Sequence, residues 1–278
     1  MSVIAPLLRG PLDGLQAAPA GGRAFSIWEA LQAMGLAGHA VFAHDHGAVA
    51  SDPGAGQRIR DLSGRGFDFA LGADLTASTD DPVFRGIPGG LDKNTYRGHD
   101  GGDSHAALAN NAAIDAMHKA AALYTLVFYL QFPNFAALQI LAATARLTSD
   151  VGIRQMVGTS GQLSIAINNG GGTFQAQLAS SITLTANVPS VVVIAIDEDG
   201  GAGASHARIN TLVEAFDGVI TAPSSAAAAR TLRIGGNDIG TQNFVNGTRL
   251  YARAMLDVAM TQAESGDLMR LLSARTAA

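Results

Sequence analysis

The chain has 278 residues, of which 47% are hydrophobic, and this is enough to bury a large core in one main domain. The net charge is −5 and no stretch of the sequence is rich in basic residues, which argues against nucleic-acid binding. Cysteine is absent, so disulfides, thiolate metal sites and cysteine nucleophiles are excluded. No window approaches the roughly 18 apolar residues of a membrane span, and we expect no membrane insertion.

Residues 1–24 are rich in Ala, Gly, Pro and Leu without a clear period, which is typical of an extended arm. They show no signal-peptide pattern, so we expect synthesis in the bacterial cytoplasm without a signal peptide. Ser26 and Glu29 then form a capping box that opens a short helix. This helix either covers an edge of its own domain or docks onto a partner. We assign 1–38 to attachment or oligomerisation and 39–278 to the main domain.

The next segment contains His44, Asp45 and His46, an H-x-H pattern that in a strand points both imidazoles the same way. Such a pair can contribute to a metal site, with His39 nearby in sequence. Because the pattern resembles a strand entering a loop, we expect the two histidines to be exposed. Residues 51–105 carry several turn signals, and 110–122 predict a brief helix with Asn111 as its cap.

Persistent alternation of apolar and polar residues from 124 to 256 predicts antiparallel strands. Expected strands are at 163–167 and 174–178, joined by a glycine turn, and a third follows at 182–186. The segments 124–132 and 191–197 are apolar on both faces, which suits central strands. We therefore predict an all-β antiparallel sandwich with a few short helices.

The last predicted strand, 249–256, places Leu250, Ala252 and Ala254 on a buried face and Arg249, Tyr251 and Arg253 on a solvated face. Thr261 and Glu264 then form a second capping box, followed by leucines at helical spacing. A C-terminal helix is expected to pack across the sandwich.

The order of several short motifs resembles the laminin G-like, concanavalin A-like jelly-roll domains, in particular copies found in virion proteins of bacteriophages and gene transfer agents. The matching segments are QRIRDLSGRGFDFALG (57–72), YRGHDGGDSHAAL (96–108), YTLVFYLQFP (124–133), SVVVIAIDEDG (190–200), TLRIGG (231–236) and NFVNGTRLYARAMLDVAMTQAESGDL (243–268). The resemblance implies a concanavalin A-like jelly roll from about residue 40 onward. His99, Ser104 and His105 depart from the residues that the family usually has at these positions.

This resemblance implies a non-catalytic structural or adhesion component of a phage or phage-like particle, such as a head spike, tail fibre or decoration protein. The implied location is the particle surface, and the implied partners are other virion subunits and further copies of the chain as a homo-oligomer. Host surface carbohydrate is the candidate ligand. These expectations rest on analogy of fold.

Asp100 and Asp103, in the segment HDGGDS, are the candidate metal ligands, because family members that bind calcium use loop carboxylates and carbonyl oxygens. The alternative is structural, with an aspartate capping a turn through backbone N–H groups. No other cofactor is expected.

The alternative function is a glycoside hydrolase or lyase of the concanavalin A-like fold acting on host polysaccharide. Such a glycosidase needs two carboxylates on either side of the glycosidic bond. Asp197 and Asp199 share a face by parity, but they follow the apolar part of their strand, and a solvated turn is the simpler interpretation. We therefore expect the chain not to be an enzyme.

Overall fold

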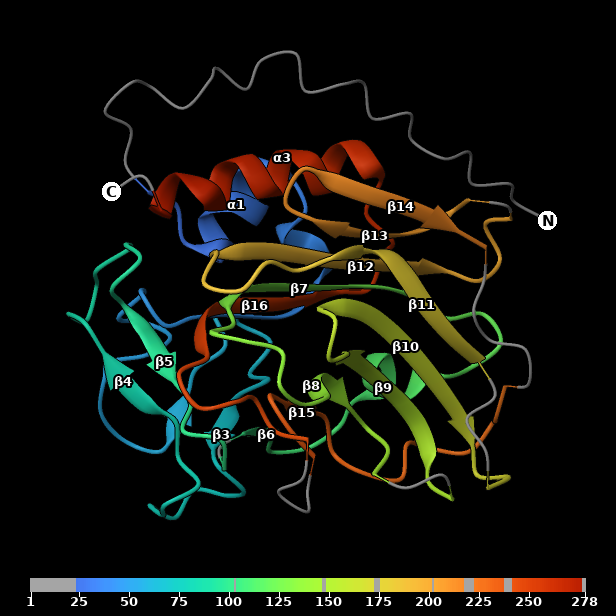
Figure 1. The fold of residues 1–278 in the computed structure, drawn as a ribbon, viewed down its shortest axis with the longest axis horizontal. Coiled ribbons are helices and arrows are strands. Elements are labelled where there is room, and N and C mark those ends of the chain that lie inside the picture. Colours follow the sequence, from blue (N-terminus) through green and yellow to red (C-terminus); the bar gives the residue numbers. More distant parts are fainter. Residues whose placement is uncertain are drawn as a thin grey trace.

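The computed structural model describes residues 24–102, 104–146, 149–172, 176–201, 203–217, 223–237 and 242–276, with the side chains of 176–179 and of Thr276 left aside. Nearly all of the predicted arm, and Asp103, therefore lie outside the described residues. Within them the chain forms sixteen strands in two antiparallel sheets and three α-helices, which confirms the all-β sandwich (Figure 1). The helices are α1 (Ile27–Ala33), α2 (Ala112–Ala116) and α3 (Gln262–Ser273), with 3-10 turns at Ala37–His39 and Ala274–Thr276.

Sheet A has the order β14-β13-β12-β7-β16-β5-β4, and β1 also pairs with β16. Its strands are β1 (Ala40–Asp45), β4 (Val83–Arg85), β5 (Tyr96–Gly98), β7 (Leu123–Gln131), β12 (Ser190–Asp197), β13 (Ser205–Ile209), β14 (Leu212–Phe216) and β16 (Arg249–Leu256). The two strands predicted to be central, β7 and β12, are adjacent and buried along almost their whole length, which confirms that prediction.

Sheet B has the order β11-β10-β9-β8-β15-β6-β3-β2. Its strands are β2 (Arg58–Ile59), β3 (Phe69–Leu71), β6 (His105–Ala107), β8 (Gln139–Ala143), β9 (Val151–Val157), β10 (Gln162–Asn169), β11 (Ala176–Thr183) and β15 (Arg233–Ile234). The separate strand predicted at 182–186 is wrong. β11 continues through Ser180 to Thr183, because Glu214 accepts from the Ser180 hydroxyl and the Ser181 N–H and holds this serine pair in the strand.

Two apolar layers hold the fold together. The main core lies between the sheets, with Phe128, Leu141, Ile165 and Ile194 among its fully or almost fully buried members. A second layer lies on the outer face of sheet A, where α1 and α3 cover β7, β12 and β16 (Figure 1). Both faces of the central strands are therefore buried.

Both predicted capping boxes are present. Ser26 and Glu29 exchange hydrogen bonds at the start of α1, and Thr261 and Glu264 do the same at the start of α3. Asn111 caps α2, as predicted. α1 packs on its own sandwich, and the docking of residues 1–23 onto a partner stays a prediction.

The solvated face predicted for β16 is wrong. Tyr251 and Arg253 are both fully buried, for two reasons. A bulge between Leu250 and Ala252 breaks the alternation, so that Tyr251 joins Ala252 in the layer under the helices. Arg253 instead points into the space between the sheets, on the side of Leu250 and Met255.

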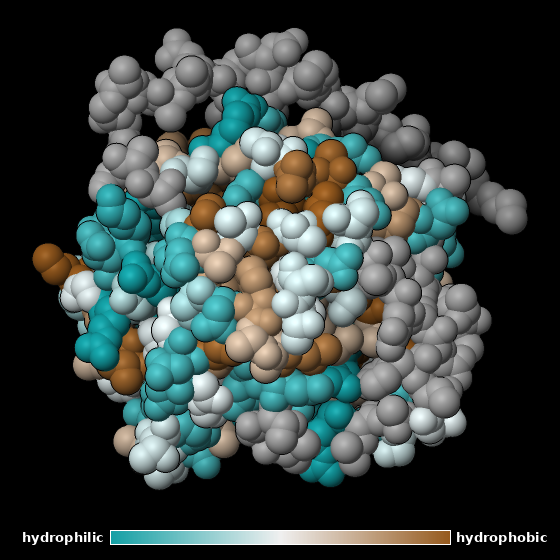
Figure 2. Space-filling view, in the orientation of Figure 1, coloured by the Kyte–Doolittle hydropathy of each residue, from teal (hydrophilic) through white to brown (hydrophobic). Residues whose placement is uncertain are grey.

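The visible surface is mixed in character. Figure 2 shows hydrophilic residues over much of the side that carries β4 and β5, and apolar residues gathered at the level of α3 and β14. Leu212 and Val213 of β14 are 51% and 38% exposed. Among the described residues, none of the helices combines the length and the apolar character needed to cross a membrane.

The connection from β16 to α3 depends on one buried hydroxyl. Thr125 of β7 donates to the carbonyl of Val258 at 2.7 Å and accepts from the N–H of Met260 at 2.8 Å. Thr125→Val keeps the shape but leaves both backbone groups without a partner, so the free energy of unfolding should fall by about 1–3 kcal/mol. Urea denaturation measures this change. The exposed Thr185→Val is the control, and an equal loss in both variants would contradict the assignment.

Candidate functional site

The helices α1 and α3 cover the outer face of sheet A and leave the outer face of sheet B free of helices. Residues directly opposite each other in antiparallel strands point to the same side of the sheet. The register aligns a row of arginines and alanines across seven strands on this side, and the neighbours Ile59, Phe69 and Ile234 point into the core. We call this the arginine row; it consists of Arg58, Ala70, Ala106, Arg233, Ala143, Arg154 and Ala166.

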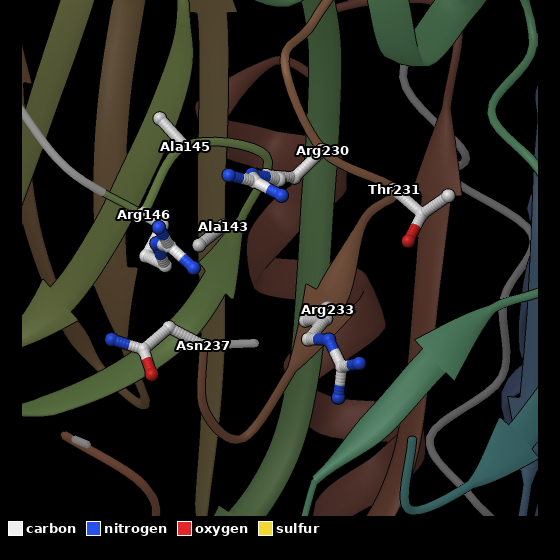
Figure 3. Close-up of a pocket in the computed structure, with 7 residues that line it drawn as sticks. All are labelled: Ala143, Ala145, Arg146, Arg230, Thr231, Arg233 and Asn237. Carbon is white, nitrogen blue, oxygen red and sulfur yellow. The ribbon is translucent and has the colours of Figure 1, made fainter. Parts of the chain in front are cut away.

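A small hollow lies beside the centre of this row (Figure 3). Its cavity volume is only about 10 Å³, and three of its seven described lining residues are arginines. We call it the arginine hollow; it is lined by Ala143, Ala145, Arg146, Arg230, Thr231, Arg233 and Asn237. In Figure 3, Arg230 extends from the segment that enters β15 towards the end of β8, where Arg146 lies.

Hydrogen bonds and one ion pair position these arginines. Asp150 lies 3.6 Å from the Arg230 Nε and accepts from the backbone N–H of Arg146 at 2.8 Å. Arg233 donates from Nη1 to the Ser104 hydroxyl at 3.0 Å. Among the described residues, three guanidinium groups therefore lie around the hollow with the carboxylate of Asp150 beside them.

A second, wider hollow lies alongside and is rich in amides. We call it the amide groove; it is lined by Gly101, Ala137, Leu138, Gln242, Asn243, Phe244, Val245 and Asn246. Gln242 and Asn246 are exposed, and Phe244 is fully buried beneath them, where its ring packs on His99 and Phe132. Side-chain amides offer both donors and acceptors, which is the pairing that sugar hydroxyls require.

The loop between β15 and β16 links the two hollows. Asn237 lines the first and Gln242 lines the second. The two limbs of the loop are tied by a hydrogen bond from the N–H of Phe244 to the carbonyl of Gly235 at 2.8 Å. Arg154 of the arginine row also donates to Gln242. The hollow and the groove are therefore neighbours, whereas Arg154 and the four alanines of the row are buried.

A different polar cluster is sealed between the sheets. Asp52 accepts from Arg97 through both carboxylate oxygens, each at 2.7 Å, and from His46 Nδ1 at 2.8 Å. The Cζ of Arg253 lies 4.4 Å from the centre of the Phe69 ring. None of the three guanidinium nitrogens of Arg253 has a hydrogen-bond partner among the described residues. All these polar side chains are buried.

Burial sets the protonation of this interior cluster. Desolvation lowers the pKa of His44 and His105 well below the usual value of 6.5, with the charge of Arg253 as the next cause. Desolvation also lowers the pKa of His46, against the opposing effect of Asp52. Burial brings the pKa of Arg253 down to about 9. The hydrogen bonds from His46 and Arg97 hold the pKa of Asp52 far below its usual range, although its burial acts in the opposite direction.

The exposed H-x-H pair predicted from the sequence is wrong, since His44 and His46 are fully buried. Both point between the sheets because they share parity with Phe42, which belongs to the core. Asp45 points the other way, where it accepts from Arg275 at 2.9 Å and from the N–H of Ile27 at 2.8 Å. Across the described ranges no group of three or more potential ligands is placed to hold a metal ion.

The predicted calcium ligands, Asp100 and Asp103, stay a prediction. Asp100 is exposed and its Oδ1 accepts from the N–H of Gly102 at 3.0 Å, which is the turn geometry of the structural alternative. Asp103 lies outside the described residues. Asp197 is the last residue of β12, and Asp199 follows it in the next turn. The N–H of Asp197 donates to the Ser205 hydroxyl at 3.0 Å.

Sequence reasoning missed the arginine row because its members come from segments far apart in the chain. Arg58, Arg154 and Arg233 are isolated basic residues in sequence, and only the strand register brings them together. The signal that could have indicated them is parity, since each arginine alternates with a core residue of its strand.

Comparisons with known proteins support the fold. No family model matches the chain, and no curated protein matches its sequence. Among solved structures it resembles a Trypanosoma rangeli sialidase in complex with sialic acid, at 12% identity and a TM-score of 0.54 over 85% of this chain and 33% of that one. It also resembles the botulinum neurotoxin serotype D binding domain, at 10% identity and a TM-score of 0.56 over 84% of this chain and 52% of that one.

A third similar structure is the binding domain of botulinum neurotoxin DC in complex with rat synaptotagmin II, at 9% identity and a TM-score of 0.55 over 85% of this chain and 52% of that one. The chain thus spans between a third and about half of the length of these proteins. At such identities the likeness shows the fold alone, a β-sandwich.

The interior cluster predicts two opposite mutational effects. Asp52→Asn leaves the buried Arg97 without its counter-charge, so the free energy of unfolding should fall by about 3–5 kcal/mol. Arg253→Met keeps the volume and removes a buried charge that has no hydrogen-bond partner among the described residues, so stability should stay the same or rise. Denaturant titration of both variants measures this contrast. A greater loss in Arg253→Met would contradict it.

The same cluster predicts loss of stability in acid. The buried imidazoles of His44, His46 and His105 have a lowered pKa in the folded state, so the unfolded chain binds more protons below pH 6.5. Their contribution is therefore complete well above pH 6.5 and is lost as the pH falls through and below 6.5, with a slope that approaches about 1.4 kcal/mol per pH unit for each histidine. Unfolding between pH 7 and 5 measures the slope. His105→Phe should reduce it by one proton, and an unchanged slope would contradict this account.

Proposed function

We propose that this chain is a non-catalytic adhesion module that binds carbohydrate on the surface formed by the amide groove and the arginine hollow. The observation that carries the proposal is the grouping of exposed amides beside guanidinium groups on the broad face that the helices leave uncovered. Amides and arginines recognise hydroxyl and acidic groups through paired hydrogen bonds. The fold is compatible with this role, since a sialidase holding sialic acid has a similar sandwich.

The absence of catalysis is supported by the chemistry of the two hollows. Hydrolysis of a glycosidic bond generally needs two carboxyl groups about 5–10 Å apart on either side of the bond. Neither set of described lining residues includes an aspartate or a glutamate. The described lining residues thus offer hydrogen-bonding groups that suit a sugar, and none of them is a carboxyl group that could serve as acid or nucleophile.

The proposal also includes a biological setting for the module. We place the module on the surface of a phage or phage-like particle, as a spike, fibre or decoration protein that associates with other virion subunits and with its own copies. The order of the sequence motifs supports this setting. Mass spectrometry of purified particles from the source bacterium tests it, and absence of the chain from such particles would remove the setting without touching the carbohydrate site.

Binding to a panel of bacterial surface polysaccharides tests the site. Asn246→Ala removes an exposed amide of the groove, so affinity for the bound polysaccharide should fall about two- to tenfold. Asn94→Ala, an exposed asparagine just before β5, is the matched control and should leave affinity unchanged. Isothermal titration calorimetry measures both.

Two results would overturn the proposal. One is a lack of binding to every polysaccharide in the panel. The other is release of reducing sugar that disappears in Asp197→Asn, which would establish the glycosidase alternative.

A further inference from the structure

We propose that a small monovalent anion, represented by chloride, binds between the two sheets at Arg253 and His105. This site is separate from the proposed carbohydrate surface, because both side chains are fully buried inside the sandwich. Their complete burial also restricts the ligand, since a sealed interior admits a single small ion and excludes a larger acid.

The interior cluster carries one more positive charge than negative charge when its imidazoles are neutral. Arg97 and Arg253 are the cations, and Asp52 is the carboxylate whose charge acts on Arg253. Both oxygens of Asp52 are already bound by Arg97. The other buried carboxylate of the described residues, Asp45, points to the outer face of sheet A and pairs with Arg275. Arg253 is thus a buried cation without a counter-charge of its own among these residues, which is costly unless an anion compensates it.

Strands of both sheets place polar groups around Arg253. In sheet A, Arg253 of β16 lies opposite His44 of β1. In sheet B, the paired strands β3 and β6 carry Phe69 and His105. The Cζ of Arg253 lies 4.4 Å from the centre of the Phe69 ring, and the His105 ring stacks on that of His46. After desolvation, the charge of Arg253 is the largest cause of the lowered pKa of His105, so the two groups lie close together between the sheets.

Hydrogen bonding determines which imidazole can donate to an anion. His46 Nδ1 donates to the Asp52 carboxylate, and His44 Nε2 donates to a backbone carbonyl at 3.1 Å. The second nitrogen of each of these neutral rings is therefore an acceptor, which an anion does not bind. Neither nitrogen of His105 has a hydrogen-bond partner among the described residues, and the same holds for the three guanidinium nitrogens of Arg253. One anion can accept from both side chains.

A buried water molecule is the rival occupant. Water also accepts hydrogen bonds from buried donors, but it carries no charge and leaves the excess positive charge of the interior in place. An anion accepts charge-assisted hydrogen bonds, which are the stronger kind, and it neutralises the guanidinium of Arg253. The charge count therefore favours the anion over water.

Exchange of chloride tests the site. The protein is refolded from urea in sodium chloride or in sodium gluconate at the same ionic strength, because gluconate is too large for a sealed interior. An ion that binds the folded state alone raises the folding equilibrium constant as its concentration exceeds Kd. A rise from about 0.03 to about 0.3 M chloride should therefore raise that constant about three- to tenfold. Urea denaturation at pH 7 measures the change.

Variants locate the effect on Arg253. Arg253→Met removes the buried charge and should abolish the dependence on chloride. In gluconate this variant should be at least as stable as the wild type, and the wild type should gain on it as chloride rises. Arg85→Gln, at an exposed arginine of β4, is the control and should keep the full dependence on chloride.

Crystals grown in bromide locate the ion directly, and this measurement does not depend on whether Arg253→Met folds. Bromide should give an anomalous peak in contact with the guanidinium group of Arg253. Three results would each overturn the proposal: a wild type that is no more stable in chloride than in gluconate, an equal chloride dependence in Arg253→Met, or the lack of a bromide peak at Arg253. The last result would assign water to this position. None of the three bears on carbohydrate binding.

Discussion

Strand β16 is the element on which the rest of the sandwich depends. One edge pairs with the central strand β7, and the other edge pairs with β5 near its start and with β1 near its end. Three segments far apart in sequence are thereby joined to one strand close to the C-terminus. Its two faces are buried as well, one in the core and the other beneath α1 and α3. Formation of sheet A thus requires contacts of long sequence separation, which typically slows folding.

This position of β16 also creates the polar end of the core. Arg253 lies opposite His44 of β1, and both side chains enter the space between the sheets. At this end the interior holds imidazole and guanidinium groups instead of the aliphatic side chains that fill the region around Ile165 and Ile194. A core built in this way gives specific geometry at the expense of desolvation. The single network centred on Asp52 supplies the compensating hydrogen bonds.

Much of the architecture could be predicted from the sequence, because alternation, glycine turns and capping boxes are local signals. β7, β10, β12 and both capped helices follow directly from them. Local signals failed at three places, each for a physical reason. The bulge before Ala252 shifted the parity of β16, β11 continues through its serines with a shift in register and with Glu214 bonded to them, and the second sheet encloses His44 and His46. The candidate site was not predictable, because it depends on cross-strand register.

The ends of the described chain have a consequence for how the molecule can be displayed. α1 follows the first described residues and α3 precedes the last ones, and both helices lie on the outer face of sheet A (Figure 1). Arg154 and Arg233 lie on the opposite side of the sandwich. A linker or carrier joined directly before α1 or directly after α3 would therefore lie on the outer side of sheet A. Attachment directly after α3 would thus leave the side of the sandwich that carries Arg233 directed into solution, and several copies on one support would all present that side outward.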